Sequence, residues 1–302
     1  MVETQIFILH WSSTTHIYPN QFTLEAIRSI QELTDGSYEI VVVDNYSDDE
    51  AVNDLMAKLP SDVVFVKNDR ASRSVNSGRN KIWSLVDADY FTVLHTDVRV
   101  SKGWLRNMLA ELKMAEEKYQ KPCVISPLYL PYFISNQSLY DRFSSHFTVD
   151  THKKLEAYCK SCRNLSIENG HVSCGSYGFY TADGHQLMMF VASKWFRDTV
   201  GEWDELYDGA NYDDSDMGLT AILKGCKNLQ SQTVYIQHLQ GISVGFGHLY
   251  GGTNQRRFIE KWGKETFDKL RGGQLWIDLH KDENTSRKEE EALRNLDASE
   301  LF

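Results

Sequence analysis

The chain has 302 residues, with 32 Lys plus Arg against 42 Asp plus Glu and a formal net charge of −10. Hydrophobic residues at 41% and charged residues at 25% are typical of a globular protein and exclude a disordered or fibrous chain. The acidic balance argues against a nucleic-acid binder, and no run approaches the roughly 18 apolar residues of a membrane span. The five Cys and a start without signal-peptide features predict a reducing compartment, the cytoplasm, with docking on a membrane face left open.

The first 100 residues alternate strand and helix patterns. Strands are predicted at Gln5–Leu9, Tyr38–Val43, Val63–Val66 and Phe91–Leu94, and helices at Phe22–Leu33, Asn76–Leu85 and, further on, Trp104–Tyr119. Tyr38–Val43 is apolar on both faces, which favours a buried parallel strand. Strands joined by helices predict an α/β fold with a parallel sheet and right-handed crossovers.

The regular alternation ends after Val124–Ser126. Residues 128–183 are rich in Tyr, Phe, Ser, His and Cys without clear periodicity, and we expect an insertion over one edge of the sheet. Later elements are predicted at Gln186–Val191 (strand), Met217–Lys224 (helix), Thr233–Gln237 (strand) and Arg256–Leu270 (helix). We expect one domain over residues 1–270 and a charged helical tail over residues 271–302.

The insertion contains a possible metal site of its own. Cys159 and Cys162 form a Cys-x-x-Cys pair, and His171 and Cys174 follow within a few residues. Two such pairs of soft ligands suit a tetrahedral structural Zn²⁺, and chance clustering of buried thiols is the alternative.

Polar clusters stand where the predicted strands end, the edge at which open parallel sheets bind ligands. Asp44 directly follows a buried strand and can accept hydrogen bonds from a ligand; an ordinary turn is the alternative, and taken alone the cluster favours it. Arg79, near the start of a helix, suits a phosphate, or belongs to a plain N-cap. His95 and Asp97 end another strand, where Asp97 is the stronger candidate ligand for a hard divalent cation.

The densest acidic cluster lies later in the chain. Asp213, Asp214 and Asp216 crowd three carboxylates into four residues, which tends to raise one pKa and suits a general base. An acidic helix start that matches the helix dipole is the alternative. Trp203, just before this cluster, has a ring that suits either stacking on a sugar or packing in the core. His238 ends another predicted strand and could complete the ligand set of a metal ion.

The order of these motifs resembles the inverting GT-A glycosyltransferases of the family-2 type. The resemblance runs from Ile6 to about Gly263, interrupted by the insertion, and is carried by VVVDNYSDD, SGRNKIW, YFTVLHTDV, GEWDELYDGANYDDSDMGLTAILKG, VYIQHLQGIS and FIEKWG. The chain departs from the family pattern at His95, where the metal motif usually begins with Asp, and at Asp213, where Glu is common. Ile82 replaces the Gly of the family's A-R-N-x-G helix.

The resemblance implies a GT-A (Rossmann-like) fold, with a mixed, mainly parallel sheet flanked by helices. It implies inverting transfer of a sugar from a nucleotide-diphosphate donor, most simply a UDP-sugar, to a carbohydrate or lipid-linked glycan acceptor, as in glycan or polysaccharide assembly. It further implies Mn²⁺ or Mg²⁺ as cofactor. The residue roles that follow are Asp44 on the nucleoside, Arg79 and His95 near the nucleotide, Asp97 and His238 on the metal, Asp214 as general base, and Trp203 and Asp213 near the donor or acceptor sugar.

Three other functions stay open. A nucleotidyltransferase would want a glycine-rich basic loop after the first strand, where this chain has His10-Trp11-Ser12-Ser13. A catalytically impaired nucleotide- or sugar-binding protein is suggested by His95, although Asp97, Asp214 and His238 argue against it. A zinc-bearing interaction module would occupy only a small share of the chain.

Overall fold

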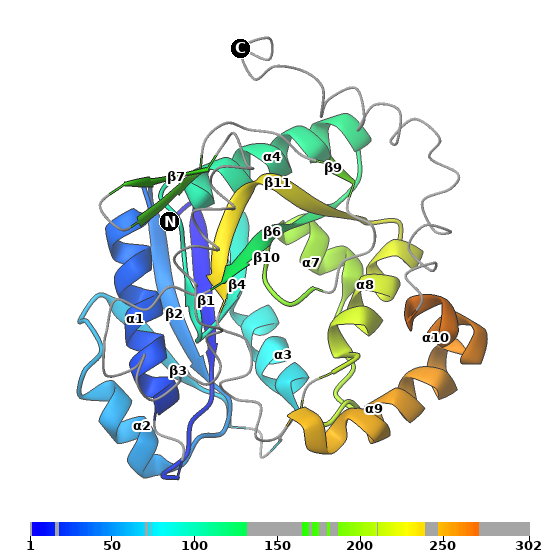
Figure 1. Ribbon diagram of the computed structural model, residues 1–302, viewed down its shortest axis with the longest axis horizontal. Coiled ribbons are helices and arrows are strands. Elements are labelled where there is room, and N and C mark those ends of the chain that lie inside the picture. Colours follow the sequence, from blue (N-terminus) through cyan, green and yellow to red (C-terminus); the bar gives the residue numbers. More distant parts are fainter. Residues whose placement is uncertain are drawn as a thin grey trace.

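The computed structural model describes residues 2–15, 18–69, 72, 74–131, 165–168, 171–174, 180–181, 187–209, 211–238 and 247–271. Its centre is a β-sheet with helices on both sides (Figure 1). The strands are β1 (Thr4–His10), β2 (Tyr38–Asp44), β3 (Val63–Lys67), β4 (Tyr90–His95), β5 (Val98–Arg99), β6 (Cys123–Pro131), β7 (Leu165–Glu168), β8 (His171–Cys174), β9 (Tyr180–Thr181), β10 (Phe190–Ser193) and β11 (Lys227–His238). The helices are α1 (Tyr18–Leu33), α2 (Asp49–Met56), α3 (Val75–Leu85), α4 (Trp104–Tyr119), α7 (Lys194–Val200), α8 (Asp213–Leu223), α9 (Gly247–Trp262) and α10 (Lys264–Arg271).

The sheet is mixed, with the strand order β3-β2-β1-β4-β10-β6-β11-β5 and β9 paired to β11. Strands β3, β2, β1 and β4 run parallel to one another, and β6 runs parallel to β11. Strand β10 lies antiparallel between β4 and β6, and β5 and β9 are antiparallel to β11. Strands β7 and β8 form a separate antiparallel pair. The expected mixed α/β sheet is confirmed.

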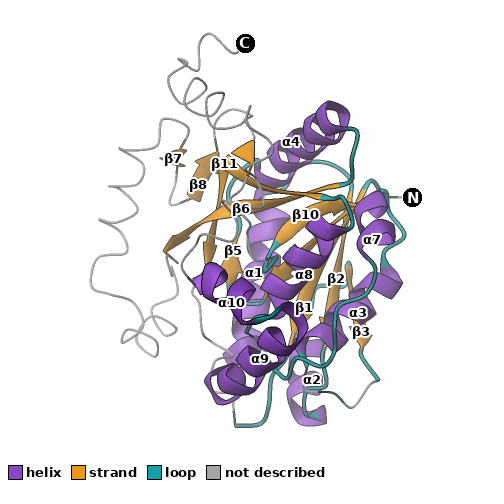
Figure 2. Ribbon diagram, turned by 90° about the vertical axis from the view of Figure 1, so that its right-hand side faces the viewer, coloured by secondary structure: helices purple, strands orange, loops and turns teal. Residues whose placement is uncertain are grey.

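Alternation along the strands builds one core on each face of the sheet. Ile6 and Ile8 of β1 pack in the cluster that contains α1 and α4, whereas Phe7 and Leu9 pack in the cluster that contains α3, α7 and α8. Successive side chains of a strand point to opposite faces, so a strand apolar throughout must be covered on both sides. Figure 2 shows α8 in front of the strands, with α1 behind them.

The structure adds to or extends the predicted elements in several places. Helices α2 and α7 were not predicted, and α8 begins at Asp213, four residues before the predicted start. The helical segment predicted over Arg256–Leu270 is confirmed, and the structure divides it into two helices, α9 and α10, joined at Gly263, whose φ is +87°. Strand β6 continues to Pro131, so residues 128–131 pair with β11. No helix within the described ranges is long and apolar enough to cross a membrane.

Candidate active site

Three polar residues lie at the carboxyl edge of the parallel strands. The strand register pairs His10, the last residue of β1, with Asp44 of β2, and it pairs Leu9 with His95 of β4. Neighbouring strands are about 4.8 Å apart, so Asp44 and His95, on either side of β1, are separated by about 10 Å. This edge is where a doubly wound sheet binds its ligand.

Asp44, the last residue of β2, is buried. The backbone N–H of Ser47 donates to its Oδ2 at 3.2 Å, and Oδ1 has no hydrogen-bond partner among the described residues. Burial raises the pKa of Asp44, while the hydrogen bonds from Ser47 act in the opposite direction. A buried carboxylate oxygen without a partner is costly, and a ligand hydroxyl would satisfy it.

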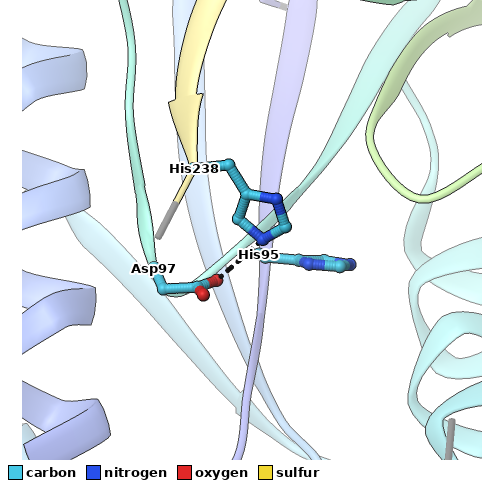
Figure 3. Close-up of side chains that lie close together, drawn as sticks. All are labelled: His95, Asp97 and His238. Carbon is cyan, nitrogen blue, oxygen red and sulfur yellow. Dashed lines mark ion pairs between the residues drawn. The ribbon is translucent and has the colours of Figure 1, made fainter. Parts of the chain in front are cut away.

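His95, Asp97 and His238 form a cluster of possible metal ligands (Figure 3). Each offers one ligand atom, and these atoms lie within 4.8 Å of one another. Nε2 of His238 lies 3.3 Å from Oδ1 of Asp97, and the two imidazole ring centroids are 5.3 Å apart. The ligands come from the end of β4, the turn after it and the end of β11.

The protonation states of this cluster fit a divalent cation. Burial, and then the nearby His238, lower the pKa of His95 to about 3, so its imidazole is neutral at physiological pH. Burial works against ionisation of Asp97, but His238 and the other neighbours lower the pKa of Asp97 below its ordinary value. A neutral imidazole and an ionised carboxylate are the forms in which these residues bind metals. Two imidazoles and one carboxylate suit Mn²⁺ better than Mg²⁺, which prefers oxygen ligands.

Helix α3 is hydrogen-bonded to the segment that precedes the acidic cluster. Ser74, its N-cap, accepts from the backbone N–H of Asn76 at 3.2 Å and donates to the carbonyl oxygen of Tyr207 at 2.6 Å. Asn76 donates to the carbonyl of Asp204 at 2.8 Å, and Asn80 donates to that of Trp203 at 3.0 Å. The polar cluster predicted as a helix start is therefore also the contact that places residues 203–207.

The three carboxylates at the start of α8 have different partners. Asp213 forms a buried ion pair with Arg79 of α3, whose side chain is 3% exposed. Asp216 accepts hydrogen bonds from Lys261 at 3.0 Å, Trp262 at 2.7 Å and the hydroxyl of Tyr207 at 3.1 Å. Sequence reasoning missed Lys261 and Trp262, because no local signal links them to a residue 45 positions away.

Asp214 is the carboxylate of this cluster for which no cation partner is recorded in the described part of the chain. Its Oδ1 accepts the backbone N–H of Ser215 at 2.8 Å. Burial, and then the charge of Asp213, raise the pKa of Asp214 to about 7, while Arg79 acts in the opposite direction. A carboxyl group with a pKa near the working pH can both accept and release a proton, as a general base must.

Arg79 connects the two halves of the site. Its positive charge acts on the pKa of Asp214 and, more weakly than burial and His238, on that of His95. The carboxylates of α8 and the ligand cluster at the sheet edge are therefore both within electrostatic range of Arg79. Of the predicted residues, His95, Asp97 and His238 lie together in one cluster, and Arg79 and Asp213 are joined by an ion pair.

Trp203 is a core residue. It is 3% exposed, its ring lies 5.6 Å from that of Trp83 in an edge-to-face contact, and the guanidinium of Arg79 lies 4.2 Å from its ring centroid. A ring that is 3% exposed offers almost no surface on which a sugar could stack in this structure. Of the two alternatives in the sequence, packing in the core is the one observed.

The predicted zinc group stays a prediction. Cys159 and Cys162 lie outside the described residues, and His171 and Cys174 are the two ends of β8. Among the described residues, the one group of three or more possible metal ligands is His95, Asp97 and His238.

Comparison with known proteins gives a family and a fold. The family model described as Glycosyl transferase family 2 matches residues 15–166, half of the chain. No curated protein matches the sequence. The match includes Asp44, Arg79, His95 and Asp97, and it ends before α8 and β11.

Among solved structures, a crystal structure of GalNAc-T7 with UDP, GalNAc and Mn²⁺ is similar, with a TM-score of 0.56 and 14% identity over 94% of this chain and 55% of that one. The chain thus spans about half the length of this structure. The structure of S. aureus TarS 1-349 has a TM-score of 0.49 and 12% identity over 99% of this chain and 77% of that one. At such identities, the likeness to GalNAc-T7 supports the GT-A fold alone.

Proposed function

Because the chain belongs to glycosyl transferase family 2, we propose that it transfers a sugar, with inversion, from a nucleotide-diphosphate donor to an acceptor hydroxyl. The observation that carries this proposal is the buried Asp214, whose pKa is about 7, together with the His95, Asp97 and His238 cluster. An inverting transfer needs a proton acceptor for the incoming hydroxyl and a positive charge for the leaving diphosphate, and these residues would supply both. The donor we expect is a UDP-sugar, and the acceptor a carbohydrate or lipid-linked glycan.

We assign the donor to the carboxyl edge of the sheet. Asp44 contacts the nucleoside through its unpartnered Oδ1, and Asp97, His95 and His238 hold the divalent cation, Mn²⁺ in preference to Mg²⁺. When bound, the cation would act as a Lewis acid and neutralise charge on the diphosphate leaving group. Arg79, next to the cluster, adds a positive charge that favours the anionic donor.

Asp214 removes the proton from the acceptor hydroxyl. As the hydroxyl oxygen forms its bond to the anomeric carbon, the bond from that carbon to the diphosphate oxygen breaks on the opposite face. The acceptor proton goes to Asp214 and the bonding electron pair leaves with the nucleoside diphosphate. A positioned general base supplies about 10²–10⁴-fold in rate.

The experiment is a donor screen. The purified chain is incubated with each common nucleotide sugar, with Mn²⁺, with Mg²⁺ and with EDTA, and release of the nucleoside diphosphate is measured. We expect release with a subset of donors, greater with Mn²⁺ than with Mg²⁺ and lost with EDTA. Asp214→Asn should lose most turnover and keep donor binding, whereas Asp97→Ala should weaken metal-dependent donor binding.

Two outcomes would overturn parts of this proposal. If Asp214→Asn retained near-normal turnover, Asp214 would not be the base. If UDP bound with the same affinity with and without metal, Asp97 and His238 would not hold a donor-linked cation. Binding of UDP without turnover of any donor would favour a catalytically impaired nucleotide-binding protein, the function that His95 suggests.

A further inference from the structure

The segment that leads into Asp214 has an unusual backbone. Asn211 and Tyr212, directly before α8, have φ values of +91° and +63°. Residues other than glycine rarely adopt this left-handed region, and they keep it only where the surrounding structure holds them there. The direction in which α8 begins, and with it the position of Asp214, depends on this turn.

Asn254 of α9 holds the turn from the inside. Its side chain is completely buried, and its Nδ2 donates to the carbonyl oxygens of Asp208 at 2.7 Å and Asn211 at 3.2 Å. Its Oδ1 accepts the backbone N–H of Asp208 at 3.0 Å. One side chain therefore bonds to both ends of the turn and satisfies polar backbone groups that burial would otherwise leave unpaired.

Helix α9 is also hydrogen-bonded directly to α8. Lys261 and Trp262, two turns after Asn254, donate to the carboxylate of Asp216. The acidic cluster is thus fixed before and after Asp214 by α9, and from the other side by the ion pair between Arg79 and Asp213. Figure 1 shows α9 at the start of α8, away from the sheet.

We propose that Asn254 is a positioning residue for the reaction: it holds the turn 208–212 so that Asp214 faces the acceptor hydroxyl. The proposal rests on the proposed role of Asp214 as base. Asn254 makes no contact with donor or acceptor in this scheme, so its loss should misplace the base without weakening the donor. A displacement of about 1 Å at a reacting group can cost on the order of 10²-fold in rate.

The test compares two substitutions at this position with a matched control. Asn254→Ala removes the hydrogen bonds to Asp208 and Asn211, whereas Asn254→Asp keeps the acceptor for the N–H of Asp208 and removes the donor. Gln5→Ala is the control, because the amide of Gln5 likewise accepts loop backbone N–H groups, those of Asp87 at 2.8 Å and Ala88 at 3.2 Å, at the opposite edge of the sheet. All three variants are made in the full chain.

We expect both Asn254 variants to lower kcat by about 10–100-fold and to leave the donor KM within about threefold, because only the transition state would lose stabilisation. Amide hydrogen exchange over residues 208–216 should be at least about tenfold faster, and UDP with Mn²⁺ should bind with affinity within about twofold of the parent. Gln5→Ala should leave kcat and the rate of amide hydrogen exchange over residues 208–216 unchanged, even if it lowers Tm by as much as the Asn254 variants do.

The proposal is overturned if exchange over 208–216 is unchanged in both Asn254 variants, or if kcat falls no further than in Gln5→Ala at an equal loss of Tm. A parallel loss of donor affinity would assign Asn254 to general stability instead. Failure of the proposed base is a separate result: Asp214→Asn would then turn over normally while the exchange difference persisted.

Discussion

Replacement of Asp214 by Asn should abolish turnover and stabilise the protein at the same time. The folded chain raises the pKa of this carboxyl from an ordinary 3.8 to about 7, chiefly through burial. That difference corresponds to about 4 kcal/mol of preference for the neutral form. Asn is close to the protonated carboxyl in shape and carries no charge, so it avoids the cost of burying an anion.

The sign of the pH dependence follows from the two pKa values. Below about pH 4 the carboxyl is protonated in the folded and the unfolded chain, and ionisation costs nothing. Between about pH 4 and 7 the unfolded chain releases the proton that the folded chain retains, so stability falls as pH rises. Above pH 7 the whole cost is present. The advantage of Asp214→Asn should therefore grow from near zero at pH 4 to about 4 kcal/mol at pH 8.

Urea unfolding of both proteins at pH 5, 6, 7 and 8 measures this difference. Asp87→Asn is the control, since the Asp87 side chain is 82% exposed and should give the same result at every pH. Turnover of the parent should fall about tenfold between pH 8 and pH 6, because only about a tenth of Asp214 remains ionised at pH 6. A variant less stable than the parent at pH 8, or a difference independent of pH, would refute the reasoning.

Three further predictions concern the residues around Asp214. Asp213→Asn should destabilise the chain by about 3–5 kcal/mol, because it leaves the buried Arg79 charge without its partner; a thermal melt at pH 7 decides. Gly78→Ala should cost about 1–3 kcal/mol in urea unfolding, since the added Cβ would lie 2.5 Å from Cδ1 of Leu9 and 2.9 Å from Cγ of Asn45, so that these packed side chains must shift; an unchanged midpoint would contradict this. His238→Ala should weaken Mn²⁺-dependent UDP binding at least about tenfold by calorimetry, and equal affinity would remove His238 from the cation site.

Local patterns were sufficient to predict the strands and the edge at which the site forms. Ile40–Val43 is apolar at every position and buried, and only a strand covered on both faces can bury such a run. Once these strands are parallel, the residues that follow them must meet at one edge, which is why Asp44 and His95 were found from the sequence. Short elements carry too few residues for a pattern, and α7 and β5 were missed for that reason.

Roles that depend on distant partners could not be predicted. The sequence next to Trp203 does not distinguish a sugar-binding ring from a core ring. The environment of the ring is determined by its contacts with Trp83 and Arg79, which lie more than a hundred positions earlier in the chain. The break between α9 and α10 depends on the left-handed φ of Gly263, inside a stretch whose apolar spacing continues through it. The hydrophobic periodicity of a sequence indicates which face of a helix is apolar, but it does not indicate where the backbone turns and the helix ends.

The acidic cluster shows how three equivalent residues acquire different chemistry. In the sequence, Asp213, Asp214 and Asp216 are alike, and all three lie in the first turn of α8, where the helix dipole favours negative charge. Arg79 from α3 neutralises the first, and Lys261 from α9 neutralises the third. Asp214, between them, is left with burial and the adjacent charge of Asp213, which outweigh the dipole and raise its pKa. In the proposed mechanism, the fold thus selects the general base by supplying cations to its neighbours. The elements that supply them, α3 and α9, are also hydrogen-bonded to the segment that leads into α8.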